Sequence, residues 1–491
     1  MTTVDEPSHP ALEEWPTPGQ DLVQLLGTAR LVTVANRLPC AWPPCEEHLV
    51  PTPGGLASTV LPVARRSQAT WIGSTTDAAD ATPRMIDDIR LVPVPLTAAQ
   101  EEGYYAGFSN GAIWPLYHDA LRPSRFRRAL WDQYVAVNRM FADAAIAECD
   151  RDDVVWVHDY HLQLVPLMVR AARPHARIGF FLHIPFPDPS LFRRLPWRSA
   201  ILRGLLGADV VGFQDGNSAR NFQRCCQELG IGATDGEAVR HANGVTVVGA
   251  FPVATDGMVL DELSRWPGAD LGAASLRQQC GNPEVLLLGV DRLDYTKGID
   301  VRLRAYEMLL RSGRLDADKT VFVQVAPPSR TDIREYQAEQ GRVERAVARI
   351  NGRHGSPGHQ PVLYLNQSMS TEELVAAYRA ADVMVVTPLR DGMNLVAKEY
   401  VAAQYDHRGA LVLSEFAGAA ALLDLAHIVN PYDLPSVAAG ILAAVTAPRA
   451  EASERMRRMR EAVMAESPER WAHAFLKTVV EQRGPSAGAA H

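Results

Sequence analysis

A carboxylate stands at each end of a short segment, Asp391 and Glu399, in the stretch RDGMNLVAKEY. A strand is predicted immediately before it, at residues 382–387, and the Asp-Gly pair predicts a turn that leads into a helix. Carboxylates accept hydrogen bonds, and the N–H groups at the start of a helix bind anions. A turn followed by an amphipathic helix gives by itself no reason for this pair. The spacing raises the question of which ligand would use both groups.

Two cations follow another predicted strand, residues 285–291, in the stretch DRLDYTKG. Arg292 and Lys297 lie five residues apart, in the predicted turn and helix start. Such a pair could hold a diphosphate with the help of backbone N–H groups. Surface cations with ordinary carboxylate partners are the alternative, and this motif alone favours neither interpretation.

Polar residues and glycines recur where other predicted strands end. Loop residues at such positions often face a cleft, and glycines allow the backbone to approach a ligand closely. Each signal is weak alone, but their accumulation at strand ends predicts a binding site. The residues are Arg37, Gly54, Gly55, Asp159, Tyr160, His161 and His183.

Short apolar runs, at intervals too long for hairpins, predict the fold class. Runs that are apolar throughout are typical of strands buried on both faces, and helical patterns at residues 190–206 and 371–380 lie between them. This alternation predicts parallel α/β sheets. The runs cover residues 31–36, 154–159, 178–184, 208–213, 245–251, 285–291, 321–326, 362–366, 382–387 and 410–415.

The predicted strands fall into two groups, and residues 254–282 between them carry no strong strand signal. We predict two doubly wound domains, residues 29–253 and 283–460, with a cleft at the carboxyl ends of their strands. Residues 1–28 are expected to be a poorly ordered extension. Residues 461–491 are expected to form a C-terminal helix and tail that cross back to the N-terminal domain.

Composition and charge argue against several classes of protein. The 491 residues carry a formal net charge of -8, which gives no sign of a nucleic-acid or anionic-membrane partner. No apolar run reaches membrane-spanning length, and the acidic start lacks the features of a signal peptide. The six cysteines form no Cys-x-x-Cys pair, so a reduced cytoplasmic protein is expected. No convincing set of metal ligands is visible, and neither a metal nor another cofactor is predicted.

Together the motifs resemble those of trehalose-6-phosphate synthases, a family of retaining glycosyltransferases with the two-domain GT-B fold. The match runs from about Leu31 to Leu476 and is specific, because the motifs are long, ordered and correctly spaced. The resemblance implies an α/β protein in which two Rossmann-like doubly wound domains face each other across a cleft. The matching stretches are VANRLP, PGGL, GFSN, IWPLYH, VHDYHLQLVP, GFFLHIPFP, GVDRLDYTKGI, RDGMNLVAKEY and LSEFAGAA.

The resemblance also implies a site in two parts, one for a glucose 6-phosphate acceptor and one for a nucleotide-sugar donor. The family usually has Trp-x-Gly-Trp near the acceptor, whereas this chain reads WIGS, which puts Ser74 at the second tryptophan position and implies a remodelled or more open acceptor wall. Arg292, Lys297 and Asp391 are expected to act in catalysis. The implied acceptor-binding residues are Arg37, Tyr105, Trp114, Asp159, Tyr160, His161 and Arg330. The implied donor-binding residues are Gly55, His183, Arg292, Lys297, Asp391, Gly392, Met393, Asn394, Leu395 and Glu399.

The two carboxylates of the opening stretch acquire a role through this resemblance. Asp391 would accept hydrogen bonds from hydroxyl groups of the donor glucose, and Glu399 would accept them from the ribose. The backbone N–H groups of Met393, Asn394 and Leu395 would point toward the sugar and the diphosphate. Eight helical residues span roughly 12 Å at ~1.5 Å per residue, which is the scale of such a ligand.

The implied reaction moves glucose from a nucleoside diphosphate to glucose 6-phosphate with retention, giving α,α-trehalose 6-phosphate. The sequence shows no obvious carboxylate pair for double displacement. A front-face route is therefore implied, in which the departing phosphate oxygen takes the proton of the acceptor. The alternatives are a pseudo-glycosyltransferase acting on cyclitol-type substrates and a non-catalytic sugar-phosphate sensor. The base of the donor stays open among UDP, GDP and ADP, and no sequence signature decides whether the protein is a homo-oligomer.

Overall fold

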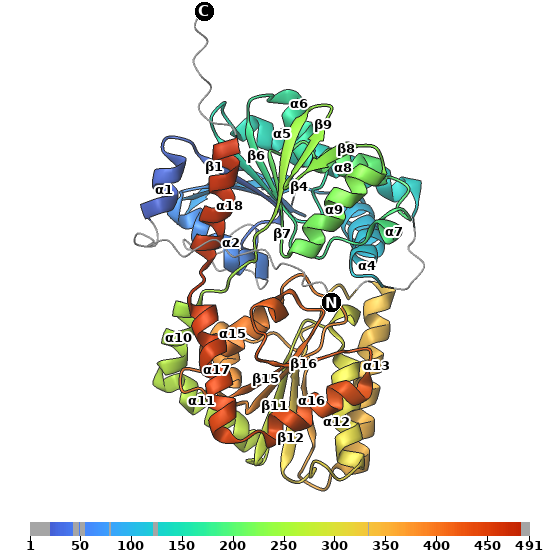
Figure 1. Ribbon diagram of the computed structural model, residues 1–491, viewed down its shortest axis with the longest axis vertical. Helices are drawn as coiled ribbons and strands as arrows, with labels where there is room; N and C mark the ends of the chain where they lie inside the picture. Colours follow the sequence, from blue (N-terminus) through green and yellow to red (C-terminus); the bar gives the residue numbers. More distant parts are fainter. Residues whose placement is uncertain are drawn as a thin grey trace, which may run out of the picture.

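Two sheets, one in each half of the chain, organise the molecule into an upper and a lower domain (Figure 1). The structure is a computed structural model that describes residues 20–42, 49, 55–77, 80–120, 126–331 and 333–482. Gly54, which the sequence analysis singled out, lies outside the described residues.

The N-terminal sheet has the strand order β3-β4-β2-β1-β5-β6-β7-β10-β9-β8. Its strands from β4 to β10 run parallel, whereas β3, β8 and β9 pair antiparallel at the edges. The elements of this domain are α1 (Gln20–Leu26), β1 (Leu31–Arg37), α2 (Gly55–Arg66), β2 (Thr70–Thr75), β3 (Arg84–Ile86), β4 (Ile89–Pro95), α3 (Ala98–Gln100), the π-helix η1 (Glu101–Ile113), α4 (Trp114–Tyr117), α5 (Arg128–Glu148), β5 (Val154–His158), α6 (Val165–Ala172), β6 (Arg177–Phe181), α7 (Pro189–Phe192), α8 (Arg198–Leu205), β7 (Val210–Phe213), α9 (Gly216–Glu228), β8 (Gly232–Asp235), β9 (Ala238–His241), β10 (Gly244–Ala250) and the last helix, α18 (Pro468–Gln482).

The C-terminal sheet is parallel throughout, with the order β13-β12-β11-β14-β15-β16. Helices cover both faces, and each face carries its own apolar cluster. The elements are α10 (Gly257–Arg265), α11 (Pro267–Gln279), β11 (Val285–Val290), η2 (Tyr295–Lys297), α12 (Ile299–Arg311), β12 (Thr320–Val325), α13 (Arg334–His354), β13 (Val362–Leu365), α14 (Thr371–Ala380), β14 (Val383–Val386), α15 (Leu395–Ala403), β15 (Ala410–Ser414), η3 (Gly418–Ala421), β16 (His427–Val429), α16 (Leu434–Thr446) and α17 (Arg449–Met464).

Both sheets have a point where the strand order changes direction. In the N-terminal sheet this switch lies between β1 and β5, and in the C-terminal sheet it lies between β11 and β14. The connections that leave two such strands diverge to opposite sides, so a crevice opens beyond their carboxyl ends and becomes a binding site in open α/β sheets. The motifs with Arg37, Asp159, Lys297 and Asp391 follow these four strands.

Every apolar run that predicted a strand contains one, but several strands carry a weaker signal. β4 contains Pro93 and Pro95, which remove ladder donors, and the hairpin β8–β9 is a half-exposed edge with no continuous apolar run. The predicted helix at 190–206 is two helices, α7 and α8. Pro196 lies between them, and a proline cannot continue the backbone hydrogen bonding of a helix.

The last helix, α18, packs in the N-terminal domain although the chain reaches it from the C-terminal domain (Figure 1). The ring of Phe475 covers Gly179 of β6 and Gly212 of β7, where a Cβ atom would come within 2.7 Å of it. Residues 20–26 of the predicted extension form helix α1, whose Leu22 and Leu26 are buried in the same apolar cluster as Phe475. The expectation of poor order is therefore wrong for this helix, because its apolar side chains have a surface to cover.

Residues 254–282, which the sequence analysis assigned to a junction, are mostly helical. α10 packs against α15, and α11 packs against α14, so both helices belong to one face of the C-terminal sheet. The chain itself passes between the domains just before α10, at residues 251–256.

We predict that Phe475→Ala lowers the free energy of unfolding by about 3–5 kcal/mol, because the two glycines beneath the ring cannot fill the cavity. Urea denaturation of the purified variant measures this loss. Lys477→Ala, an exposed change on the same helix, serves as the control and should alter stability by less than about 0.5 kcal/mol. A loss below about 1 kcal/mol for Phe475→Ala would contradict the packing role of the ring.

Candidate active site

Lys297 and Asp391 form a buried ion pair at the switch point of the C-terminal sheet. Lys297 Nζ lies 2.5 Å from Asp391 Oδ2, and their side chains are only 11% and 13% exposed. Burial raises the pKa of Asp391, but the Lys297 charge and hydrogen bond outweigh it, so the net pKa is lowered and the carboxylate is ionised. Gly298 allows the tight turn after Lys297, because its φ is +60° and a Cβ there would meet the Thr387 carbonyl oxygen at 2.2 Å.

Arg302 connects three segments of this part of the site through its guanidinium. The sequence analysis did not identify this residue. Its guanidinium is fully buried and donates to Asp291 Oδ2 at 2.6 Å, the Lys297 carbonyl at 2.7 Å and Thr387 Oγ1 at 3.1 Å. These acceptors come from the end of β11, from η2 and from the end of β14. The sequence feature that could have identified Arg302 is its position as a cation among the mainly apolar residues that α12 buries.

The turn from Asp391 to Asn394 is organised by the two side chains at its ends. Asp391 Oδ1 accepts the Gly392 N–H at 3.0 Å, and Asn394 Nδ2 donates to Asp391 Oδ2 at 3.1 Å. Asn394 has a φ of +73° and caps α15 by accepting the Ala397 N–H at 3.1 Å. The turn therefore directs the start of α15, where Leu395 lies, toward the neighbouring domain.

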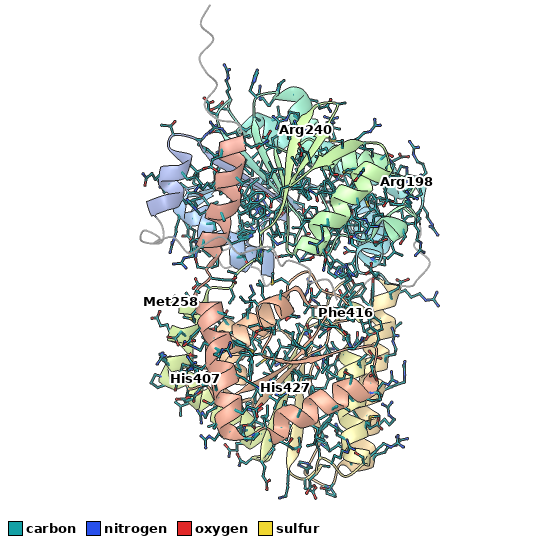
Figure 2. All side chains as sticks on the ribbon, in the orientation of Figure 1. Arg198, Arg240, Met258, His407, Phe416 and His427 are labelled. Atoms are coloured by element: carbon teal, nitrogen blue, oxygen red, sulfur yellow. The ribbon has the colours of Figure 1, made fainter. Side chains whose placement is uncertain are left out.

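The backbone of Gly392 packs closely against the N-terminal domain. A Cβ atom at Gly392 would lie 2.1 Å from the carbonyl oxygen of His183, so no larger residue fits. Phe416, whose carbonyl accepts the Asp391 N–H at 3.0 Å, lies at the end of the C-terminal domain that faces the N-terminal domain (Figure 2).

Met393 is buried in the C-terminal core, whereas Leu395 contacts both domains. A Cβ added to Gly55 at the start of α2 would lie 3.3 Å from Leu395 Cδ1. Gly55 and Leu395 thus meet across the cleft, as neighbours of the predicted donor site.

Glu399 lies on α15 and accepts a hydrogen bond from the Tyr378 hydroxyl at 2.9 Å. Burial raises the pKa of its carboxyl group, which makes it a ready acceptor for a further hydroxyl donor. The expected span of eight helical residues is wrong, because residues 391–394 form a turn and α15 begins only at Leu395. The turn, and not helix pitch alone, sets the separation of the two carboxylates.

On the other side of the cleft, Arg37, Tyr105 and His161 form a contact series. Arg37 Nη2 donates to the Tyr105 hydroxyl at 3.2 Å, and the Tyr105 ring stacks on the His161 ring with centroids 5.7 Å apart. Burial raises the pKa of Tyr105, but the positive charges of Arg330, Arg37 and Arg292 outweigh it and lower the net pKa. Arginines from both domains therefore lower the pKa of the Tyr105 hydroxyl.

Asp159 follows β5 in a strained, desolvated position. Its φ is +72°, and its Oδ1 accepts the backbone N–H of His183 at 3.3 Å. Burial raises the pKa of this carboxyl group to about 6, against the opposing effects of two backbone hydrogen bonds and of the charges on Arg330 and Arg292. A carboxylate so poorly solvated gains more than an ordinary one from a new hydrogen-bond donor.

His183 is a neutral imidazole paired with a second histidine, His158, which sequence reasoning did not single out. Their rings meet at 3.1 Å between His158 Nδ1 and His183 Nε2. Burial lowers the pKa of His183 to about 3 and places that of His158 well below its usual range. At neutral pH neither ring carries a positive charge, so His183 has no imidazolium proton to donate.

Arg330 reaches across the cleft from the C-terminal domain. It follows β12 with a φ of +51°, donates to the Tyr160 hydroxyl at 3.2 Å and lies 4.1 Å above the Trp114 ring. Asp294 Oδ2 accepts from it at 3.2 Å, and Tyr336 is a further contact. Its Nε is buried and has no hydrogen-bond partner among the described residues. Asp294 stands in the DRLDYTKG motif, where only the two cations had been assigned roles.

Arg292 is exposed and forms no ion pair with a carboxylate in the described part of the chain. Its charge nevertheless acts on Asp159 and Tyr160 of the opposite domain and on Asp294 of its own. Arg292 therefore contributes positive potential to the cleft without being neutralised there.

Ser74 lies beside Arg37, its register partner on the neighbouring strand β2. Its hydroxyl donates to the Asn36 carbonyl at 2.6 Å, so the small side chain turns back onto the end of β1.

A further ion pair joins the two domains, between Arg390 and Asp119 at 2.5 Å. Neighbouring His118 is buried, which lowers its pKa to about 4, and its Nδ1 contacts the Trp114 carbonyl at 2.9 Å. Arg390 directly precedes the predicted site residue Asp391, whereas Asp119 lies five residues after Trp114, and only the tertiary structure brings Arg390 and Asp119 together.

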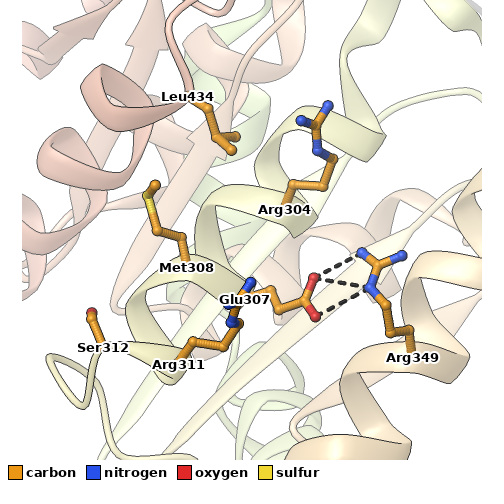
Figure 3. Close-up of a pocket in the computed structure, with 7 residues that line it drawn as sticks. All are labelled: Arg304, Glu307, Met308, Arg311, Ser312, Arg349 and Leu434. Carbon is orange, nitrogen blue, oxygen red and sulfur yellow. Dashed lines mark hydrogen bonds and ion pairs between the residues drawn. The ribbon is translucent and has the colours of Figure 1, made fainter.

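A separate concave region of about 600 Å³ lies along α12, away from the cleft (Figure 3). Glu307 and Arg349 pair there at 2.8 Å, and the dashed lines in Figure 3 mark this contact. The lining residues are Arg304, Glu307, Met308, Arg311, Ser312, Arg349 and Leu434. Because Arg302 of the same helix faces the core, α12 presents different surfaces to this region and to the site.

The described residues contain neither a candidate metal-binding cluster nor a candidate membrane-spanning helix. Among the residues that the structure describes, no group of three or more histidine, cysteine, aspartate or glutamate side chains could hold a metal ion. Within the same residues, no helix is long and apolar enough to cross a membrane.

Comparison with known proteins assigns the chain to a family. The model of glycosyltransferase family 20 matches residues 29–481. The chain belongs to glycosyltransferase family 20. It is 47% identical over 486 residues to a trehalose-6-phosphate synthase of Mycobacterium avium, covering 94% of this chain and 97% of the relative.

Solved structures of similar proteins have the same architecture. A Burkholderia xenovorans alpha,alpha-trehalose-phosphate synthase (UDP-forming) in complex with glucose-6-phosphate is 33% identical, with a TM-score of 0.87 over 92% of this chain and 100% of that chain. An E. coli structure bound with UDP-2-fluoro glucose is 35% identical, with a TM-score of 0.85 over 92% of this chain and 99% of that chain. The predicted family, the GT-B fold and glycosyltransferase activity are confirmed.

We predict that Lys297→Ala and Arg292→Ala each lower turnover by ~10²–10³-fold, the scale for losing one preorganised charge-stabilising group. Steady-state kinetics of folded, purified variants measures the loss. Arg304→Ala removes an exposed arginine of α12 outside the cleft and should leave turnover close to wild type. Near-normal turnover of both Lys297→Ala and Arg292→Ala would contradict their assignment.

Asp159→Asn is expected to stabilise the protein while impairing catalysis. The folded-state pKa, about 6, lies above the usual value near ~4, so the ionised group destabilises the fold fully above pH ~6 and not at all below ~4. Above pH ~6 the neutral amide should raise the free energy of unfolding by up to about 3 kcal/mol, and the gain should vanish toward pH ~4. Thermal unfolding across this pH range provides the measurement.

Asp153→Asn is the matched control for this effect. Burial raises the pKa of Asp153, but hydrogen bonds from the Asp150 and Arg30 backbone and from the Arg30 side chain lower it overall. Ionisation of Asp153 is therefore favoured by folding, and its replacement should destabilise the protein at neutral pH. A loss of stability from Asp159→Asn above pH ~6 would show that desolvation does not dominate at this carboxylate.

Proposed function

We propose that the protein transfers glucose from a nucleoside diphosphate glucose to glucose 6-phosphate with retention, producing α,α-trehalose 6-phosphate and the nucleoside diphosphate. One observation carries the proposal: the switch points of two sheets face each other, with the Lys297–Asp391 pair on one side and Arg37 with Asp159 on the other. The similarity to trehalose-6-phosphate synthases, one of them in complex with glucose-6-phosphate, supports the same reaction.

Lys297 and Arg292 stabilise the leaving group. As the glycosidic bond to the diphosphate breaks, negative charge grows on the phosphate oxygens. Two cations held in place beforehand stabilise that charge without reorganising at the moment of reaction. Lys297 is positioned by Asp391 and by the turn that Arg302 holds, whereas Arg292 supplies a cation that no carboxylate in the described residues neutralises.

Asp391 and the turn behind it bind the donor sugar. Asp391 Oδ2 accepts from Lys297 and Asn394, and its Oδ1 accepts from Gly392. The carboxylate is therefore fixed in orientation, and its remaining lone pairs accept from sugar hydroxyls. Glu399, already paired with Tyr378, accepts from the ribose.

The acceptor's proton passes to the departing phosphate oxygen on the same face of the sugar. His183 is neutral at physiological pH because burial lowers its pKa to about 3, so it accepts no proton there and orients the donor sugar. Asp391 is held ionised by Lys297 and is a poor base for the same reason. These two features support a route in which the departing phosphate oxygen, and not a protein side chain, takes the proton.

Two of the similar Burkholderia enzymes of known structure are UDP-forming, and the E. coli structure is bound with UDP-2-fluoro glucose. We propose UDP-glucose as the donor on this basis. A panel of UDP-, GDP- and ADP-glucose with glucose 6-phosphate held constant tests this choice, and analysis of the product distinguishes true glucosyl transfer from coupling of cyclitol-type units. A sensor without catalytic activity would form no trehalose 6-phosphate with any donor.

Arg330 and Arg37 bind the acceptor phosphate between the two domains. Arg330 comes from the C-terminal domain but contacts Tyr160 and Trp114 of the N-terminal domain, and Arg37 reaches the same group of rings through Tyr105. One dianionic phosphate between these arginines draws the domains together and excludes water from the anomeric carbon.

Arg330→Ala should therefore damage transfer to glucose 6-phosphate far more than transfer to glucose. We expect kcat/KM with glucose 6-phosphate to fall on the order of 100-fold, whereas the low activity with glucose should fall less than about 10-fold, because glucose has no phosphate to bridge the arginines. Kinetics of both enzymes with both acceptors measures the difference. Arg330→Lys keeps the charge and should recover part of the loss; equal proportional losses on the two acceptors would rule out the phosphate bridge.

A further inference from the structure

Within the residues that the structure describes, the chain passes between the two domains twice, and both passages lie side by side. We call residues 251–256, between β10 and α10, and residues 465–467, between α17 and α18, the double crossing (Figure 1). A Cβ added to Gly257 would lie 2.8 Å from the sulfur of Met464, and Trp471 Nε1 donates to the Phe251 carbonyl at 3.1 Å. Any change in the angle between the domains must bend both segments of the double crossing.

Lys398 joins the two segments of the double crossing. Its ammonium group donates to the Val253 carbonyl at 2.9 Å and to Glu466 Oε2 at 2.9 Å. Val253 lies in the first segment and Glu466 in the second, whereas Lys398 itself lies on α15. One side chain therefore links three parts of the chain that are far apart in sequence.

Packing alone does not explain a lysine at this position. The Lys398 side chain is 1% exposed, and removing an ammonium group from water costs several kcal/mol before any partner compensates for it. Burial lowers the pKa of Lys398, and Glu466 opposes that shift. A methionine would fill much the same volume without this cost, so the donors of Lys398 have a purpose besides filling space.

The helix that carries Lys398 is also the helix of the predicted donor site. α15 is capped by Asn394, begins with Leu395 at the contact with Gly55, and carries Glu399 directly after Lys398. A rigid helix transmits a rotation at one residue to its neighbours. Movement of the double crossing therefore moves the residues proposed to hold the sugar, the diphosphate and the ribose.

We infer that Lys398 is a positioning residue that couples the angle between the two domains to the placement of α15 in the donor site. The inference deepens the proposed function and rests on it for the role of α15. When the cleft closes on its ligands, Lys398 keeps both segments of the double crossing attached to α15. The helix therefore reaches its ligand-binding position only when the domains reach theirs.

Lys398→Met tests this coupling, because it keeps the volume and removes the donors. We expect kcat/KM for both substrates to fall ~10–100-fold, with a lower kcat, as for other residues that misplace reacting groups from a distance. Small-angle X-ray scattering of the full chain, free and with UDP plus glucose 6-phosphate, should show that the ligand-induced decrease in radius of gyration is reduced or lost. A merely structural lysine would lower the melting temperature without altering either readout well below it.

Three further variants make the result decisive. Glu466→Gln removes only the charged partner and should give a smaller effect of the same kind, whereas Lys398→Arg keeps donors and should recover part of the closure. Glu307→Gln removes another buried carboxylate, which pairs with the partly exposed Arg349 in Figure 3, and should leave kinetics and closure unchanged. It controls for general loss of stability.

The outcomes separate this inference from the proposed function. Wild-type closure and kcat in Lys398→Met, or in Glu466→Gln and Lys398→Arg if the first variant does not fold, would overturn the coupling. Failure of the wild-type enzyme to make trehalose 6-phosphate would overturn the proposed function instead, and the scattering comparison would still report on the double crossing. An equal loss in Glu307→Gln would also overturn the coupling.

Discussion

The C-terminal half of the site depends on one buried guanidinium, that of Arg302. It donates to Asp291, to the Lys297 carbonyl and to Thr387, which terminate or follow the two strands at the switch point. A buried cation without partners at that position would strongly destabilise the folded protein. Because Arg302 has these acceptors, it instead fixes the loop between β11 and Lys297. The ion pair between Lys297 and Asp391, and with it the turn at the start of α15, is positioned by this arrangement.

Three of the residues with a strained backbone lie where ligands are proposed to bind. Asp159, Arg330 and Asn394 all have positive φ, a conformation that costs free energy for residues other than glycine and persists only where surrounding contacts impose it. Asp159 is also desolvated enough to raise its pKa to about 6. These residues lower the free energy of unfolding, and the buried cores of the two sheets, together with α18, compensate for that loss.

The two domains are connected by contacts of different kinds at different places. Apolar and backbone contacts occur at Gly392 and Leu395, polar contacts occur at Arg330 and Arg390, and the covalent connection occurs at the double crossing. Of these contacts, only those of Arg330 and Arg390 place charged groups in the cleft. A ligand that brings two phosphate-bearing groups would interact with these charges and so with the angle between the domains.

The sequence by itself determined the fold class and supplied the residues of the candidate site. Runs such as 285–290 and 383–386 are apolar on both faces, which only a covered parallel sheet accommodates, and the motifs at their ends identified Lys297 and Asp391. Edge strands such as β8 and β9 escaped prediction because half-exposed strands need no continuous apolar run. The tertiary structure decided what lies across the cleft: that Arg330 contacts Tyr160, that His158 pairs with His183, and that Lys398 holds two distant crossings. Such contacts join residues that are far apart in sequence. Local sequence patterns cannot predict them, because these residues become neighbours only when the two sheets pack face to face.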